Sequence, residues 1–468
     1  MTSTASLPFV ILVFVTAGLY SILGKRIRPW LLLVVSLAFY GSFNWQFLYL
    51  LLAVIGVTFL AGLSVHHHPD KRWQVPLWAL VILSPLLFYK YFLAWFSGLL
   101  ETFIPVSELD FGTYGAVLIP VGLSFFTFQC LAYVIDLSNK EFKPERNPFR
   151  FTLFVAFFPQ LLAGPIERWL DLSKQIFKAA RPSPEMVLGG LQLLTYGLFM
   201  KLVLGDWLGF YVDNAYAVPA DNSSAAAFLG LYGFTLQIYA DFCGYSLIAV
   251  GSARLFGVRL TMNFRQPLFA RNIVEFWRRW HISLTRWIGD YVYRPIGFFM
   301  LGNKSLPRFV MEGGTVTVTW VTMAMWHGAT WPFVVLGICQ AGLFMVHGYW
   351  ARWRRREPTR LGSVFSGLLT FHVIVLTFTL ARSPTMANYI DLWSAALALT
   401  PGGVPFTGVT FNIIVGLVIV LTVDACRHFF PEFRLRSLFA RTASIGILII
   451  LAILMGHDET KTFIYFRF

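Results

Sequence analysis

Long apolar runs recur from one end of this sequence to the other, and residues 30–40, 76–87 and 445–455 are examples. A helix needs roughly 20 mostly apolar residues to cross a bilayer, and on that measure about ten to twelve segments qualify. Only 13% of the residues are charged, whereas soluble domains carry about a quarter. Too few charges are present to cover a water-facing surface, so the sequence predicts an all-α polytopic membrane protein.

The formal net charge of +14 indicates membrane topology rather than nucleic-acid binding, because of where the basic residues lie. They gather in short clusters between the apolar runs, namely Lys25/Arg26/Arg28, Lys71/Arg72, Arg278/Arg279, Arg352/Arg354/Arg355/Arg356 and Arg434/Arg436/Arg441. Short basic loops between spans face the cytoplasm. The charge therefore indicates topology, and the first apolar run, whose basic residues follow it, is expected to be a helix with its N-terminus outside rather than a cleaved signal peptide.

No polar stretch is long enough for a soluble module, so one membrane domain, 1–468, is expected. The cysteines are scattered in apolar surroundings without a CxxC pair, which favours small buried hydrophobes over disulfides or zinc ligands; they are Cys130, Cys243, Cys339 and Cys426. Three consecutive histidines, 66–68, cannot converge on one ion from a helix, and a loop just past a membrane helix is expected there. No metal is expected.

Residues 263–293 interleave aromatic and basic side chains and are too polar to span. We expect an amphipathic helical segment that lies at the interface or dips in from the cytoplasmic side. Rings that suit interface depth are Trp277, Trp280, Trp287, Tyr291 and Tyr293. Interface anchoring alone does not account for His281 or for the paired Arg278 and Arg279.

His327 lies in MAMWHGATW (323–331), within an apolar run, 315–337, that otherwise predicts a spanning helix. Ionisable residues at membrane depth usually face a cavity and are candidates for function. An imidazole must also satisfy two ring nitrogens, which hydrocarbon cannot do. Gly328 and Ala329 are expected to leave room beside the ring for another backbone or a ligand chain.

Two further ionisable residues are candidates. His281 is expected at the start of a semi-polar helix, where an exposed interface histidine and a functional one are equally open readings. Asp241 falls in the apolar run 228–250, so a basic or hydroxyl partner is expected, and a helix-locking bond is as good a reading as catalysis. Two histidines that meet could supply a base and an orienting group, but spacing alone does not bring them together.

Eight stretches, in order, make the sequence recognisable: SLAFYGSFNWQF (36–47), LLFYKYF (86–92), IPVGLSFFTFQCLAYVIDL (119–137), FFPQLLAGPIERW (157–169), FTLQIYADFCGYS (234–246), EFWRRWHISLTRWIGDYVYRPIG (275–297), MWHGATWPFVVLG (325–337) and FIYFRF (463–468). The chain resembles the membrane-bound O-acyltransferase (MBOAT) family, in particular its bacterial AlgI-like branch. The resemblance implies a bundle of about eleven transmembrane helices with re-entrant or interfacial helices around a central pore. It also implies that His327 is the catalytic base and that His281 orients it or the thioester carbonyl.

The resemblance further implies an acetyl group taken from a cytoplasmic donor, acetyl-CoA, and passed across the inner membrane to an exported polysaccharide such as alginate or cellulose. Its expected partners are a periplasmic SGNH-type acetyltransferase and a polysaccharide synthase and export complex. Arg278 and Arg279 are candidates to pair with the donor's phosphates, and Asp241 and Trp326 are further substrate-binding candidates.

Three alternatives remain open from the sequence. The same fold could transfer D-alanine from a carrier-protein thioester to teichoic acid. A transporter could use the histidines for proton coupling, although no matched pair of broken hydrophobic segments points to one. A purely structural membrane subunit would keep its activity when His327 is replaced.

Overall fold

The computed structural model describes residues 4–71, 73–92, 120–302, 307–353, 359–403, 408–432, 435, 437–457 and 463–464. Within these ranges every regular element is a helix. The chain folds as two compact units, Met1–Leu191 with Ala249–Thr261, and Gln192–Ile248 with Met262–Phe468. We call these unit 1 and unit 2. The expectation of a single domain stays a prediction.

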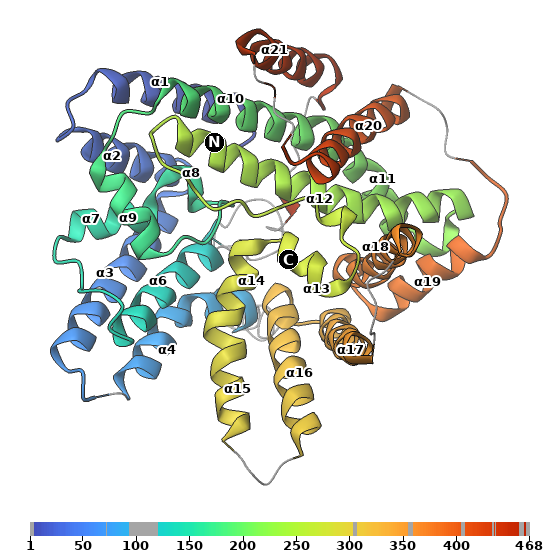
Figure 1. Cartoon of the computed structure of the whole chain (residues 1–468), viewed down its shortest axis with the longest axis horizontal. Coiled ribbons are helices and arrows are strands. Elements are labelled where there is room, and N and C mark those ends of the chain that lie inside the picture. Colours follow the sequence, from blue (N-terminus) through green and yellow to red (C-terminus); the bar gives the residue numbers. More distant parts are fainter. Residues whose placement is uncertain are drawn as a thin grey trace, which may run out of the picture. The chain divides into compact units, whose positions relative to one another are not determined.

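Unit 1 is built around buried aromatic rings. Its helices are α1 (Leu7–Ile22), α2 (Arg28–Gly41), α3 (Trp45–His67), α4 (Gln74–Leu87) with the π-helical η1 (Phe88–Phe92), α6 (Leu123–Ser138), α7 (Pro148–Ala156), α8 (Phe158–Leu161), α9 (Trp169–Lys178) and the start of α10 (Pro184–Phe199). Helix α6 packs against α3 and α4, and α2 packs against α7 (Figure 1). Phe9, Phe39 and Phe158 contact one another edge-on or tilted, with ring centroids 5.3 to 6.1 Å apart.

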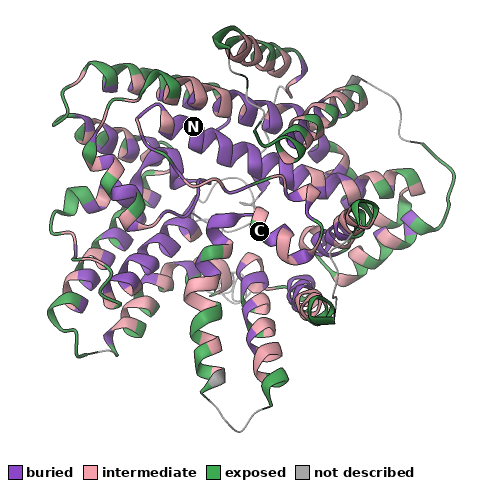
Figure 2. Cartoon of the chain, in the orientation of Figure 1, coloured by how far each residue is buried: buried purple, intermediate pink, exposed green. Residues whose placement is uncertain are grey.

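Unit 2 holds the remaining elements. They are the end of α10, the π-helical η2 (Met200–Gly205), α11 (Asp206–Ala217), η3 (Pro219–Asp221), most of α12 (Ser224–Arg254), η4 (Pro267–Phe269), α13 (Ile273–Arg279), α14 (Ile282–Ile288), η5 (Gly289–Tyr293), α15 (Arg294–Leu301), α16 (Arg308–His327), α17 (Trp331–Trp353), α18 (Arg360–Arg382), α19 (Met386–Leu397), α20 (Gly408–Phe429) and α21 (Leu438–Met455). The middle of α12 is buried on nearly every side (Figure 2), as expected for a helix that is apolar all round. Helices α15 and α16 form a hairpin, and α16 packs along α17.

The prediction of a polytopic α-helical membrane protein is confirmed. Seven described segments are long and apolar enough to span, namely Trp45–His67, Gln74–Phe92, Pro184–Ala217, Trp331–Trp353, Arg360–Arg382, Thr410–Phe429 and Leu438–Met455. Three shorter apolar helices join them, Leu7–Ile22, Arg28–Gly41 and Leu123–Ser138. On α21 most of the exposed side chains are apolar, as for Ile453 at 76% exposed, which suits a helix facing lipid. The figure of about eleven spans stays a prediction.

The prediction of one spanning helix over 315–337 is wrong. Helix α16 ends at His327 and α17 begins at Trp331. Gly328 has extended backbone, with φ −170° and ψ 144°, so the helical hydrogen bonds stop there. Pro332 then occupies the first turn of α17, where the missing N–H costs nothing.

Residues 263–293 are helical in pieces. The helices α13 and α14 are separated at Trp280 and His281, and His281 has φ +42° in the left-handed region. Trp277, Trp280 and Trp287 are all less than 8% exposed. Interface anchoring is therefore wrong for these three rings, because they pack inside the protein.

Several smaller predictions are also tested. His66 and His67 lie in the last turn of α3, so the loop expected for residues 66–68 is wrong for these two. Cys130 and Cys243 are buried, as expected. Cys426 is exposed, so its reading as a buried hydrophobe is wrong. Of the predicted clusters and motifs, Arg72, Arg354–Arg356, Arg434, Arg436, Ile119 and the last four residues of FIYFRF lie outside the described residues.

Candidate functional site

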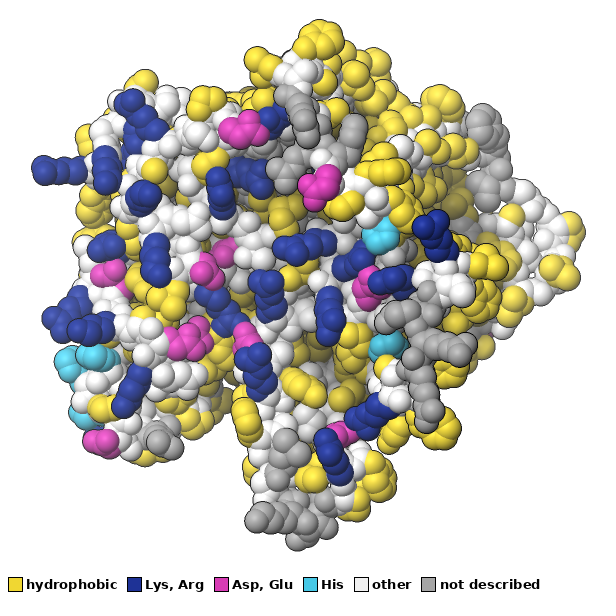
Figure 3. Space-filling view, in the orientation of Figure 1, with side chains coloured by type: hydrophobic (Ala, Val, Ile, Leu, Met, Phe, Trp, Pro, Cys, Tyr) yellow, Lys and Arg dark blue, Asp and Glu magenta, His cyan; other side chains and the backbone are white. Residues whose placement is uncertain are grey.

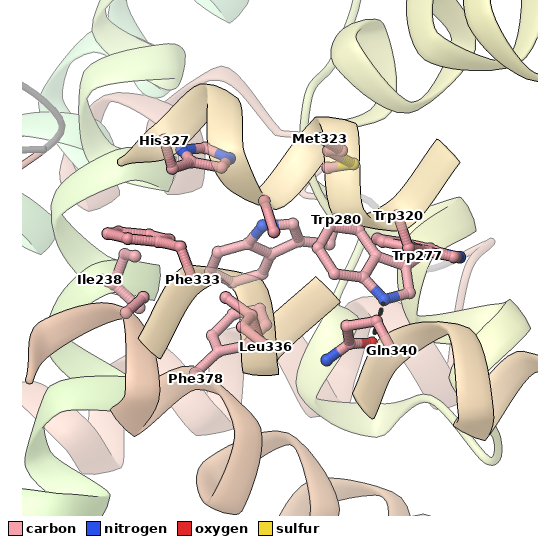
Figure 4. A pocket seen from close by; sticks show the side chains of 12 residues that line it. Ile238, Trp277, Trp280, Trp320, Met323, His327, Phe333, Leu336, Gln340 and Phe378 are labelled. Carbon is pink, nitrogen blue, oxygen red and sulfur yellow. Dashed lines mark hydrogen bonds between the residues drawn. The ribbon is translucent and has the colours of Figure 1, made fainter. Parts of the chain in front are cut away.

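His327 lines a cavity of about 60 Å³ inside unit 2. The other lining residues are almost all apolar or aromatic, namely Ile238, Trp277, Trp280, Trp320, Met323, Ala324, Phe333, Leu336, Gln340, Phe378 and Ala381. Figure 4 shows His327 at one end of this group and the Trp277–Gln340 pair at the other, with Trp280 between them. The cavity therefore places a titratable imidazole against an apolar space.

The break between α16 and α17 sets the position of His327. As the last residue of α16, its ring lies beside Trp326, with centroids 4.4 Å apart, and nearly parallel to Phe333 at 6.4 Å. A Cβ at Gly328 would clash with the Phe333 ring. The space predicted beside Gly328 is thus filled by Phe333, and the room near His327 lies in the cavity instead.

The far end of the cavity is held by a chain of buried hydrogen bonds. The indole Nε1 of Trp277 donates to Oε1 of Gln340 over 3.0 Å, and Nε2 of Gln340 donates to Oγ1 of Thr377 over 2.9 Å. The Trp277 ring also packs on Trp320 at 4.6 Å. Because these polar groups satisfy one another, the wall they present to the cavity is effectively apolar.

His281 is fully buried, so the reading of it as an exposed interface residue is wrong. It precedes α14, as predicted, and its ring contacts Phe242 edge-on at 4.6 Å. The bend is fixed by Asn263, whose carbonyl accepts from the Ile282 N–H and whose Oδ1 accepts from the Ser283 N–H. Burial lowers the pKa of His281 to about 3, so it is neutral at physiological pH. His281 does not line the cavity of His327, but its neighbour Trp280 does.

Asp241 has the basic partner that was expected. Its carboxylate lies 2.6 Å from Nζ of Lys201, which also pairs with Asp206 at 2.5 Å. The other Asp241 oxygen accepts from the backbone N–H of Ile464 over 2.8 Å. All three charged side chains are at most 3% exposed. Sequence reasoning missed Lys201 and Asp206, although both lie in a long apolar stretch and carried the same signal as Asp241.

The remaining candidates do not converge on the cavity. Arg279 is engaged by Oε1 of Glu275 at 2.5 Å and by Nδ1 of His428 at 3.1 Å. Arg278 is exposed. Trp326 is buried beside His327 without lining the cavity. Of the predicted site residues, only His327 itself faces this space.

The described residues contain no group of three or more His, Cys, Asp or Glu side chains placed to hold a metal ion. What the geometry offers is a histidine that can exchange a proton at the edge of an apolar, largely aromatic-walled space. A neutral imidazole there can take a proton from a hydroxyl group and return it to a leaving group.

Comparison with known proteins places the chain in a family. Residues 123–383, more than half of the chain, match the model of the MBOAT, membrane-bound O-acyltransferase family. A probable alginate O-acetylase AlgI of Pseudomonas syringae pv. tomato is 32% identical over 387 residues, which is 79% of this chain and 70% of that protein. The peptidoglycan O-acetyltransferase of Helicobacter pylori is 29% identical over 402 residues, 80% and 74% of the two chains. The teichoic acid D-alanyltransferase of Bacillus subtilis is 25% identical over 265 residues, 55% and 67% of the two chains. This chain belongs to the membrane-bound O-acyltransferase family.

Proposed function

We propose that this O-acyltransferase takes an acetyl group from acetyl-CoA on the cytoplasmic side and delivers it for O-acetylation of an exported polysaccharide. The observation that carries the proposal is His327 at the edge of the apolar cavity. Similarity to an alginate O-acetylase and to a peptidoglycan O-acetyltransferase supports acetyl as the group transferred.

In the proposed reaction His327 is the general base. It takes the proton of an acceptor hydroxyl as the oxygen attacks the thioester carbonyl, so that a C–O bond forms and the C–S bond breaks. The thiolate leaving group then receives the proton. The mostly apolar lining of the cavity beside His327 suits the methyl end of the acetyl group better than a sugar, whose hydroxyl groups need polar partners.

His281 remains the proposed orienting residue. Trp280, next to it in the chain, lines the cavity, so a change at His281 can reach the cavity through that ring. For Asp241, the ion pair with Lys201 favours helix locking over substrate binding. Arg278 is the better candidate to pair with the donor's phosphates, because the Arg279 guanidinium already donates to Glu275.

The cellular location, the partner proteins and the polymer are also part of the proposal. We place the protein in a bacterial inner membrane, with a periplasmic SGNH-type acetyltransferase that completes the transfer and a polysaccharide synthase and export complex beside it. Alginate and cellulose are the candidate polymers. The second candidate function is D-alanyl transfer, which similarity to a teichoic acid D-alanyltransferase supports.

The test is acetyl transfer by the purified protein in lipid, supplied with radiolabelled acetyl-CoA, its periplasmic partner and the polysaccharide. We expect His327→Ala to lower the rate by about a hundredfold or more, the usual contribution of a general base. The matched control is His67→Ala, which removes an exposed histidine at the end of α3.

Equal transfer by wild type and by a folded His327→Ala protein would remove His327 from the mechanism. Label that moves only from a D-alanyl carrier protein, and not from acetyl-CoA, would replace acetylation by the second candidate function.

A further inference from the structure

A larger cavity, of about 300 Å³, lies in unit 1 and contains none of the residues discussed for catalysis. It is formed where the loop before α2 and the first turns of α2 meet the start of α7 and the end of α9. Its lining residues are Arg26, Pro29, Trp30, Leu33, Asn147, Phe149, Arg150, Leu153 and Phe177. Two guanidinium groups thus share one concave site with three aromatic rings.

The charge of this site is positive. Arg26 is exposed and makes no ion pair with any described residue. Arg150 lies over the Phe177 ring, with Cζ 4.1 Å from the centroid, and its Nε is 3.5 Å from Glu145. One acidic group therefore faces two arginines, and the surplus favours an anion. Figure 3 shows Lys and Arg side chains over this part of unit 1, as over the rest of the same face.

The site is built before any ligand arrives. Arg28 is buried and donates to the carbonyls of Tyr20 and Leu23 at the end of α1, and to the carbonyl of Ala179 just past α9. These bonds fix the loop that carries Arg26. On the other wall, Oδ1 of Asn147 accepts from the N–H groups of Phe149 and Arg150 and so fixes the start of α7. Little ordering of the backbone is left for binding to perform.

The surroundings are those of a membrane surface. Helices α1 and α2 are apolar, and Lys25 and Arg26 in the loop between them, with Arg28 at the start of α2, predict a cytoplasmic loop. Trp30 and Phe149 are 50% and 56% exposed and contact each other at 5.2 Å. Half-exposed aromatic rings of this kind sit at the level of lipid headgroups.

We propose that this cavity binds the headgroup of an anionic phospholipid of the cytoplasmic leaflet. The phosphate pairs with Arg26 and Arg150, while the glycerol and the first methylenes lie against Trp30, Leu33 and Leu153. Basic pockets beside membrane helices on the cytoplasmic side recognise headgroups in this way. The site goes beyond acyl transfer, because it needs neither His327 nor a donor.

The experiment measures binding of fluorescent phosphatidylglycerol and phosphatidylcholine to the full-length protein in detergent micelles. Wild type should prefer phosphatidylglycerol. The double variant Arg26→Gln/Arg150→Gln should lose about ten- to thirtyfold in affinity for phosphatidylglycerol and little for phosphatidylcholine, because each arginine contributes about a factor of five. Raising the salt concentration should weaken wild-type binding toward that of the variant.

The matched control is Lys174→Gln/Arg181→Gln, which removes the same charge from exposed positions of unit 1 outside the cavity. It should keep the wild-type preference. Arg26→Gln alone, a change at an exposed residue, tests the site if the double variant melts early. An unchanged preference in a folded Arg26→Gln protein would overturn the proposal, as would equal loss in the control. Competition by free CoA at a concentration that displaces labelled phosphatidylglycerol would also overturn it, since the cavity would then be a nucleotide site.

Discussion

Lys201 forms ion pairs with two buried carboxylates, those of Asp206 and Asp241. Removing its charge would take the cation away from both buried acids. We expect Lys201→Met to destabilise the protein by about 3–5 kcal/mol, the usual effect of breaking a buried ion pair. Asp206→Asn should cost less, because the pair of Lys201 with Asp241 survives.

Thermal unfolding in detergent measures this difference. Lys174→Met is the control, since Lys174 is exposed and the substitution is the same. A Lys201→Met protein that melts with the wild type would mean that the two carboxylates are stabilised by other groups.

For single residues, the sequence predicted that Asp241 needs a partner, and that expectation is confirmed. It did not predict which partner, because Lys201 lies 40 positions earlier (241 − 201) and only the packing of two helices brings the charges together. The candidate site was harder to predict. The neighbouring residues in the sequence identified His327 and His281 as ionisable groups in apolar surroundings. They did not show that Phe333 fills the space beside Gly328.

Between helices, the Lys201–Asp241 pair depends on a close crossing of α10 and α12. A Cβ at Gly197 would lie 2.6 Å from the carbonyl oxygen of Gly244, and a Cβ at Gly244 would lie 2.8 Å from that of Gly197. Only glycine allows backbones to approach so closely. We expect Gly197→Ala to separate the helices, weaken the ion pair one turn later, and lower the melting temperature by several degrees.

Gly446→Ala is the control for this substitution, because a Cβ there meets no atom within 4 Å. It should be neutral or slightly stabilising, as alanine is favoured over glycine inside a helix. If both variants melt together, the crossing tolerates a methyl group and the glycine pair is not required.

Helix boundaries show where sequence patterns stop being informative. The run 315–337 is mostly apolar throughout, yet the helix is interrupted between His327 and Trp331. The signal was present in Gly328 and Pro332, but both residues also occur within membrane helices. Tertiary packing, here the Phe333 ring against Gly328, decides the outcome.

For the molecule as a whole, hydropathy was enough to predict an all-α polytopic fold, because every backbone group in lipid must be satisfied within its own segment. The division into two compact units could not be predicted in this way. Apolar side chains that face lipid and those that face protein look alike in a sequence. Trp277, Trp280 and Trp287 were accordingly placed at the interface, although they are buried in unit 2.

Acid stability is a property of the whole folded chain to which His281 contributes. Its pKa is lowered by burial from 6.5 to about 3. Between these two pH values the unfolded chain binds a proton at this residue and the folded chain does not. Stability should therefore fall as the pH drops below 6.5, by up to about 1.4 kcal/mol per pH unit from this group. Glu275, whose pKa is raised by burial but brought below its usual 4.5 by hydrogen bonding to Arg271 and pairing with Arg279, adds to the loss only at lower pH.

In the window from pH 6.5 to about 4.5 the contribution of His281 changes with pH, whereas that of Glu275 stays nearly constant. We expect His281→Asn to flatten the dependence of the melting temperature on pH in this window. Asparagine tolerates the φ of +42° at this position and carries no titrating group. Because catalysis is not measured, the outcome is independent of the proposed role of His281 in acyl transfer. Identical slopes for the variant and the wild type would contradict a neutral, buried His281 and would assign the acid sensitivity to other groups.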